Sequence, residues 1–192
     1  MCSIHTSQRH FHHTELRLAQ NGFTLANLLT SLAIIAIVCS FAIPGFDGLW
    51  KKNRLRIQQS ELQRVLNYTR SQAINTGSTA IICPSNDDIN CSGNWQQPLI
   101  IFSDINNNRS RDANEPLLRK AILIQPDRET LAIRTSGSSN LLRYKATGET
   151  SGQNGRFFYC LGDTEEYRGQ IIFLRTGRSR FAHESELQSG CG

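Results

Sequence analysis

Residues 22–44 read Gly22-Phe-Thr-Leu-Ala-Asn-Leu-Leu-Thr-Ser-Leu-Ala-Ile-Ile-Ala-Ile-Val-Cys-Ser-Phe-Ala-Ile-Pro44. The 21 residues from Phe23 to Ile43 carry no charge. As a helix that rises about 1.5 Å per residue they extend roughly 31 Å, close to the thickness of a bilayer's hydrocarbon core. Small and polar residues interrupt the run, which is typical of helices that pack against other helices. Residues 23–44 are therefore predicted to form a membrane-spanning helix that also contacts neighbouring helices.

The start of this run carries a processing motif. Gly22-Phe-Thr-Leu25 follows a short polar leader, and the apolar residues begin at once. This arrangement resembles the precursors of type IV pilins and pseudopilins. The resemblance implies that a prepilin peptidase cuts after Gly22, so that residues 1–22 are a cleaved leader, and methylates Phe23. The family usually has a glutamate at the fifth mature position, where this chain has Asn27, which offers hydrogen bonds but no charge.

An uncleaved signal anchor and a secretory signal peptide are the alternatives. The run is longer than an ordinary signal-peptide core, and no Ala-x-Ala site follows it. Basic residues are more numerous after the run than before it, which by itself favours the orientation opposite to that of a pilin. The cleavage motif and the cysteines argue for export, so we expect a single-pass inner-membrane protein with a periplasmic domain that later joins an extracellular pilus.

Composition limits the possible functions. The chain has 192 residues and a net charge of +5, which permits nucleic acid or anionic lipid as a partner without requiring either. His183 is the only histidine outside the leader. No nucleophile, base and orienting acid are grouped as acyl-transfer catalysis needs. We therefore expect a protein that is not an enzyme and needs no cofactor.

Four cysteines remain outside the leader and the apolar run: Cys83, Cys91, Cys160 and Cys191. An even number in an exported domain predicts two disulfides, and four cysteines allow three pairings. Cys83–Cys91 is favoured because it closes a short loop rich in turn-forming residues, which leaves Cys160–Cys191 to hold the C-terminus. A zinc site is the alternative, but the spacing lacks the close cysteine pairs of zinc ribbons.

The rest of the chain predicts an α+β fold. Residues 45–76 have apolar residues at helical spacing and form the amphipathic half of one long helix, with Gly77 as its C-cap. Residues 77–192 form an exported β-rich domain. Runs rich in Ile, Leu, Phe and Tyr predict strands at 79–83, 98–103, 116–124, 130–134, 140–144, 155–160 and 170–175. The long helix is expected to pack on antiparallel sheet, as in the type IV pilin-like fold.

Several motifs of the exported domain narrow the resemblance. Thr69-Arg-Ser-Gln-Ala-Ile74, Ile82-Cys-Pro-Ser85, Ile101-Phe-Ser-Asp-Ile-Asn106 and Thr176-Gly-Arg-Ser-Arg180 are similar to the FimT/GspH group. That group holds type II secretion minor pseudopilins and FimT-like minor pilins, some of which bind DNA for natural transformation. The resemblance favours a FimT-like pilin that binds DNA without sequence preference in competence. The alternatives are a structural secretion pseudopilin and an adhesive or priming minor pilin.

The basic motif at the C-terminal side is the candidate DNA site. Gly177 favours a tight turn, Arg175 precedes it, and Arg178 and Arg180 lie two apart on an extended chain, so they are expected on the same side. Guanidinium groups bind phosphates without regard to base sequence. Ser179 is expected to add a phosphate contact, and Arg143 and Lys145 are candidates to extend the patch. The alternative is an ordinary surface hairpin with solvated arginines.

A second motif resembles a calcium loop. Its oxygen-bearing residues are Asp104, Asn106, Asn108, Asp112 and Glu115, at the first, third, fifth, ninth and twelfth places of the loop. The sixth place, where such loops need glycine, is Arg109. A polar hairpin loop without metal is therefore favoured.

Overall fold

The computed structural model describes residues 24–162 and 165–191, with the side chains of 41–45 left out. Gly22 and Phe23, the predicted processing site, lie outside the described residues. Helix α1 runs from Leu25 to Thr76. Its residues belong to two compact units, which meet between Pro44 and Gly45 and are described separately.

The first unit begins with a capped helix end. Thr24 Oγ1 accepts a hydrogen bond from the Asn27 N–H at 3.4 Å, which satisfies one of the free donors of the first turn. The hydroxyls of Thr30 and Ser31 donate to the Asn27 carbonyl oxygen at 3.0 and 2.8 Å. These hydroxyl groups of the apolar run are thus satisfied by their own helix, while Leu28, Leu32 and Ile35 stay exposed.

Within residues 24–162 and 165–191, no helix is both long enough and apolar enough to cross a membrane. The predicted span of residues 23–44 includes Phe23 and the side chains of 41–45, which are outside the description, and it stays a prediction.

In the second unit, α1 presents the predicted apolar stripe to the β domain. Leu62, Leu66, Thr69 and Ala73 are buried, which confirms the helical periodicity, and Val65 joins them. The helix ends as predicted at a glycine whose φ is +62°, a left-handed conformation that glycine adopts without strain.

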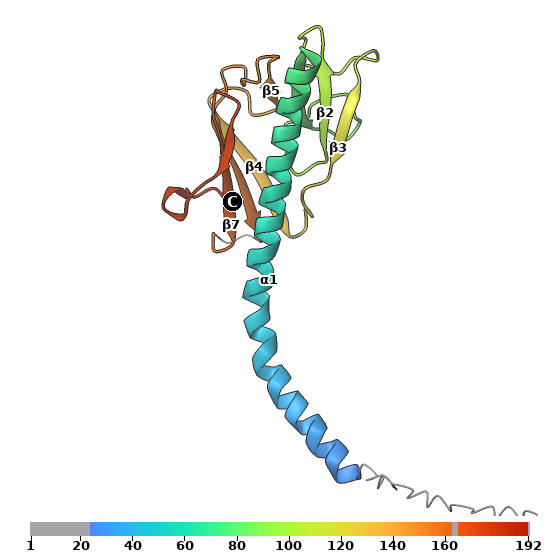
Figure 1. Cartoon of the computed structure of the whole chain (residues 1–192), viewed down its shortest axis with the longest axis vertical. Coiled ribbons are helices and arrows are strands. Elements are labelled where there is room, and N and C mark those ends of the chain that lie inside the picture. Colours follow the sequence, from blue (N-terminus) through green and yellow to red (C-terminus); the bar gives the residue numbers. More distant parts are fainter. Residues whose placement is uncertain (1–23, 163–164, 192) are drawn as a thin grey trace, which may run out of the picture. The chain divides into compact units, whose positions relative to one another are not determined.

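Two four-stranded antiparallel sheets pack against this stripe (Figure 1). Sheet A has the order β3-β2-β1-β5, and sheet B has the order β4-β6-β7-β8. The strands are β1 (Thr79–Pro84), β2 (Leu99–Asp104), β3 (Leu117–Ala121), β4 (Glu129–Thr135), β5 (Leu142–Tyr144), β6 (Gly155–Leu161), β7 (Arg168–Phe173) and β8 (Ser179–Phe181). A 3₁₀ turn, η1, spans Glu184–Glu186.

One apolar core joins the helix to both sheets. Leu142 and Tyr144 of sheet A and Phe157 and Phe173 of sheet B lie in the same buried cluster as the helical stripe. The opposite face of sheet A carries a second, smaller cluster with Ile81 and Phe102. Sheet A is therefore apolar on both faces, as its nearly continuous apolar strands require.

A buried ion pair adds to the contact between α1 and sheet B. Arg54 Nε donates to Glu129 Oε1 at 2.6 Å, and only 2% of the Glu129 side chain is exposed. The second oxygen of Glu129 accepts the Gln125 N–H at 2.8 Å. The carboxylate is thus both paired and hydrogen-bonded, which a buried charge needs.

Both disulfides have the pairing that the sequence favoured. Cys83 is bonded to Cys91 across a separation of 8 residues, and Cys160 to Cys191 across 31. The second bond fixes the C-terminal segment on the outer face of sheet B, where Gly190 lies against the Phe158 ring.

Candidate nucleic-acid interface

The candidate site is the turn that joins β7 to β8. The Leu174 N–H donates to the Arg178 carbonyl at 3.0 Å, and the Gly177 N–H donates to the Leu174 carbonyl at 2.9 Å. Gly177 has a φ of +77°. A Cβ atom at this position would lie 1.8 Å from the Gly148 carbonyl oxygen. Only glycine meets both demands, so the predicted turn chemistry is fixed by a close backbone contact as well as by φ.

A neighbouring loop, residues 145–150, is hydrogen-bonded both to helix α1 and to the β7–β8 turn. Arg70 of α1 donates from Nε to the Gly148 carbonyl at 2.8 Å, and the Thr150 N–H donates to the Arg175 carbonyl at 3.1 Å. The loop closes on itself, because the Gly148 N–H donates to the Lys145 carbonyl at 2.8 Å. The helix, this loop and the turn thus form one hydrogen-bonded unit, with Lys145 exposed on it.

The arginines of the turn differ in their partners. Arg178 is exposed, and its side chain makes no hydrogen bond or ion pair with any described residue. Arg175 is also exposed and donates from Nε to Asn154 Oδ1 at 3.3 Å, a long contact that engages one of five N–H donors. Arg178 is therefore free to donate hydrogen bonds to a phosphate, and four of the five N–H donors of Arg175 are also free.

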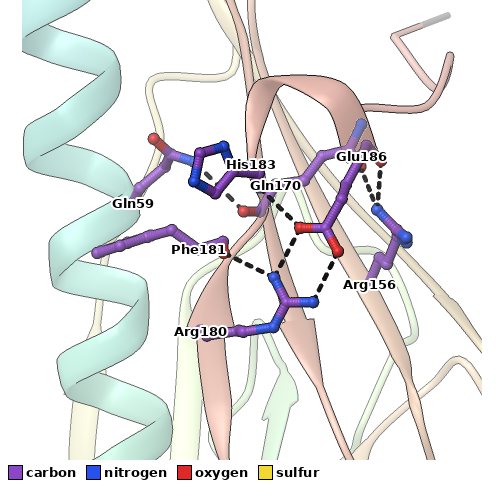
Figure 2. Close-up of polar contacts among 7 residues, drawn as sticks. All are labelled: Gln59, Arg156, Gln170, Arg180, Phe181, His183 and Glu186. Atoms are coloured by element: carbon purple, nitrogen blue, oxygen red, sulfur yellow. Dashed lines mark hydrogen bonds and ion pairs between the residues drawn. The ribbon is translucent and has the colours of Figure 1, made fainter.

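Arg180 is paired with an acid from the C-terminal segment. Its two terminal nitrogens each donate to one oxygen of Glu186 at 2.7 Å (Figure 2). The bond to Arg180, together with the His183 N–H, lowers the pKa of Glu186 to about 2. The pair is charged throughout the physiological range, so Arg180 does not offer the free guanidinium that the sequence predicted.

The ion pair between Arg180 and Glu186 forms because the C-terminal segment crosses a row of side chains on sheet B that includes Arg180. Strand register aligns Arg134 with Arg156, Arg156 with Ile172, and Ile172 with Arg180. The C-terminal segment crosses this row, with Arg156 donating to the Glu186 carbonyl at 2.7 Å and Arg134 to the Ser189 carbonyl at 3.0 Å. Sequence reasoning missed Glu186 as a partner of Arg180.

Two other predicted residues do not join the turn. The Ser179 hydroxyl is buried without a partner among the described residues, while the Ser179 carbonyl accepts a bond from Gln63 of α1 at 3.1 Å. Arg143 lies on β5 between two residues of the main core, Leu142 and Tyr144, so its side chain points to the opposite face of sheet A. The Ser179 hydroxyl is thus not exposed on the turn, and Arg143 lies on the face of sheet A away from the main core; whether either residue contacts phosphate stays a prediction.

The loop that resembled a calcium site is held by its own hydrogen bonds. Glu115 accepts the N–H groups of Ile105 and Asp112 at 2.6 and 3.0 Å. Asp112 Oδ2 accepts from the amides of Asn106 and Asn108 at 2.6 and 2.8 Å. Across residues 24–162 and 165–191, no three acidic, histidine or cysteine side chains are grouped to hold a metal ion.

The residue at the sixth place of this loop has the left-handed backbone conformation of a calcium loop. It is an arginine, however, where such a loop needs glycine. Arg109 has a φ of +70°, and its N–H donates to Asp104 Oδ2 at 3.2 Å. Asp104 Oδ1 is buried without a partner among the described residues, and burial raises the Asp104 pKa.

Comparison with known families identifies the architecture. The family described as type II transport protein GspH matches residues 58–177. The chain belongs to this family. The match covers α1 from residue 58 to its end, strands β1 to β7, and Gly177 in the β7–β8 turn. No curated protein has a significant sequence match to the chain.

Solved structures similar to the chain include a minor pilin and a minor pseudopilin. The type IV minor pilin FimU of Pseudomonas aeruginosa superimposes with a TM-score of 0.56, 22% identity, and coverage of 73% of this chain and 97% of FimU. The minor pseudopilin EpsH of the Vibrio cholerae type 2 secretion system has a TM-score of 0.48, 12% identity, and coverage of 67% and 96%. The likeness to FimU shows that the GspH-family chain has the type IV pilin-like fold.

Proposed function

We propose that this GspH-family protein is a minor type IV pilin that binds duplex DNA through its phosphates at the β7–β8 turn. The observation that carries the proposal is Arg178, an exposed guanidinium without a partner among the described residues, on a turn that α1 and the 145–150 loop hold in place. Arg175 on the same turn and Lys145 on the 145–150 loop are further exposed cations. Arg180 contributes less because Glu186 holds it.

This arrangement suits phosphate rather than base recognition. An arginine fork matches the geometry of phosphate oxygens, and a phosphate contact carries no sequence information. The turn is short, and no free helix projects from it to enter a major groove. Binding is therefore expected to be weak per subunit, independent of sequence and sensitive to salt.

The apolar helix supports a role as a filament subunit. Leu28, Leu32, Ile35 and Val38 are more than half exposed in the isolated chain, and such a surface is covered by lipid before assembly and by neighbouring pilin helices afterwards. In this proposal a prepilin peptidase cuts the inner-membrane precursor after Gly22 and methylates Phe23. The processed subunit then joins a pilus used in natural transformation.

A structural role in type II secretion is the second candidate. The description of the matching family as a type II transport protein favours it. Such a subunit assembles beneath a filament tip and needs no free cation at the β7–β8 turn. DNA binding therefore separates the two candidates.

The test is an electrophoretic mobility shift with full chain kept in solution by a nonionic detergent. The protein should retard duplex DNA of unrelated sequences equally, and Arg178→Gln should weaken binding about tenfold, since a hydrogen bond to a charged group contributes about 1.5 kcal/mol or more. Arg128→Gln is the matched control, because Arg128 is equally exposed and lies beside Gly162 at the opposite end of sheet B. Equal losses in the two variants would remove DNA binding from this turn.

A further inference from the structure

A small cavity lies close to the β7–β8 turn and is lined by two arginines. It has a volume of about 190 Å³, and Arg109 and Arg143 form part of its wall together with Ser136, Ser138 and Ser151. Neither guanidinium group makes a hydrogen bond or an ion pair with a described residue. The cavity therefore presents two unpaired cations and several hydroxyl groups to whatever enters it.

The walls of the cavity are held by a buried amide. Only 7% of Gln153 is exposed. Its Nε2 donates to the carbonyls of Ser138 and Leu141 at 3.1 and 3.0 Å, and its Oε1 accepts the Arg143 N–H at 3.1 Å. One side chain thus ties the 136–141 loop, the 151–154 loop and β5 together, so the cavity is formed before any ligand binds.

Positive charge exceeds negative charge around the cavity. Arg143 is partly buried, and burial first, then the positive charge of Arg109, lowers the pKa of Arg143, while Asp104 acts in the opposite direction. Asp104 already accepts the Arg109 N–H. That bond is to the backbone N–H and leaves the Arg109 guanidinium unpaired, so an anion in the cavity would offset the repulsion between the two guanidinium groups.

The cavity borders the proposed DNA contact. Asn154 Oδ1 accepts one bond from Arg175 Nε at 3.3 Å and another from Ser136 Oγ at 2.8 Å, and Ser136 lines the cavity. The 151–154 loop thus touches the arginine turn on one side and the cavity on the other. A strand of nucleic acid on the turn would bring further phosphates to this rim, since phosphates follow one another at short intervals along the backbone.

We propose that the Arg109–Arg143 cavity binds a phosphate group, held by the two guanidinium groups and by the hydroxyls of Ser138 and Ser151, since the Ser136 hydroxyl already donates to Asn154. The phosphate has two chemically equivalent sources, the backbone of DNA on the neighbouring turn and free inorganic phosphate. The DNA source rests on the proposed function above, and the free-phosphate source does not.

The first arm of the test measures DNA. Fluorescence anisotropy with a labelled duplex gives the affinity of the full chain in nonionic detergent at several NaCl concentrations. Arg109→Gln with Arg143→Gln should weaken binding and make the double-logarithmic salt slope shallower by about one, as expected for one lost phosphate contact. Arg143→Lys retains the charge and should recover part of the affinity, while Arg128→Gln should leave both quantities unchanged.

The second arm measures free phosphate. The melting temperatures of wild type and of the double variant are compared in sodium phosphate and in NaCl of equal ionic strength. General salt effects are the same in both proteins, so a larger phosphate-dependent rise in wild type reports occupation of the cavity. Melting in NaCl alone checks that the double variant folds.

The two arms separate the possible outcomes. A change in salt slope assigns the site to DNA phosphate. A phosphate-dependent rise confined to wild type, in a protein that does not bind DNA, supports the cavity and rejects the DNA function. Wild-type DNA binding that depends on Arg178 but not on Arg109 or Arg143, with equal phosphate effects in both proteins, overturns the cavity proposal alone.

Discussion

Three arginines within six residues have three different electrostatic environments. Arg178 makes no ion pair or side-chain hydrogen bond with any residue in the described part of the chain, Arg175 makes one long contact to a neutral amide, and Arg180 is held by both oxygens of Glu186. A cation that already has a bidentate acid partner must give it up to bind phosphate. The free energy of DNA binding is therefore expected to come mainly from Arg178.

Removing the acid should release Arg180. With Glu186→Gln we expect DNA affinity to rise several-fold at low salt and the salt slope to become steeper by about one, because one more cation reaches phosphate. Glu184→Gln is the matched control: it removes the same charge two residues away, and the Glu184 side chain has no bonded partner among the described residues. Fluorescence anisotropy measures both variants. Equal gains in both would mean that net charge, and not release of Arg180, sets the affinity.

The same pair predicts a dependence of stability on pH. The pKa of Glu186 lies at about 2 in the folded chain and near 4.5 without its partners. A lowered pKa means that the stabilisation is complete above the unfolded value and is lost as the pH falls from about 4.5 towards 2. The unfolding free energy of wild type should therefore fall more steeply over this range than that of Glu186→Gln.

At the scale of elements, the conformation of the β7–β8 turn depends on its contact with the 145–150 loop. Gly177 lies against Gly148, whose carbonyl is bonded to Arg70 of α1. The position of the arginines is thus set by a contact between segments that are distant in sequence. A change that separates the turn from the 145–150 loop should disturb DNA binding without touching an arginine.

Gly177→Ala is the test of this dependence. The positive φ alone costs about 1–2 kcal/mol for alanine, and the new methyl group would also meet the Gly148 carbonyl. We expect a loss of about 2–3 kcal/mol in unfolding free energy, measured by urea denaturation, together with weaker DNA binding. Gly162→Ala has a similar φ of +70° and no atom within 4 Å of the new Cβ, so it should cost only the backbone term and leave DNA binding intact.

Sequence patterns predicted the helix and most of the strands. The strands that were missed or misplaced have identifiable physical causes. The helical stripe, the C-cap and the apolar strands follow from periodicity and from glycine chemistry, which are local. Strand β8 was missed because its three residues, Ser179–Phe181, have no apolar alternation and pair only through the turn. The predicted strand at 116–124 ends early, at Ala121, although Leu123 and Ile124 still reach the core.

The site was less predictable than the fold. The Gly-Arg-Ser-Arg motif predicted the turn, but not the ion pair of Arg180, because Glu186 approaches only when the C-terminal segment folds back over sheet B. Local sequence patterns also did not predict on which face of sheet A the Arg143 side chain lies. Both faces of sheet A bury apolar residues, so alternation along the strand does not reveal which face looks outward.

At the scale of the second unit, residues 45–192, the Cys160–Cys191 bond ties the C-terminal segment to one end of strand β6, an inner strand of sheet B. The segment that it anchors covers the row of Arg134, Arg156 and Arg180 and supplies Glu186. The disulfide therefore anchors the segment that pairs with Arg180 and covers Arg134 and Arg156.

Replacing this cystine should cost more than replacing the other one. In the chain-entropy description, Cys160→Ser with Cys191→Ser loses about 3.5 kcal/mol, and Cys83→Ser with Cys91→Ser about 2.5 kcal/mol, because the closed loops differ in length. Guanidinium denaturation of both double variants checks the order. A larger loss for the shorter loop would show that strain or packing, and not loop closure, dominates.

The central claim is that free arginines at the β7–β8 turn bind DNA phosphates, and the salt dependence of DNA binding tests it most directly. The affinity of the full chain for a duplex, plotted against NaCl concentration on logarithmic axes, should give a slope of about −2 to −4, as expected for a few phosphate contacts. Arg175→Gln with Arg178→Gln should make the slope shallower by about two. No binding at low salt, or an unchanged slope in the double variant, would contradict the account.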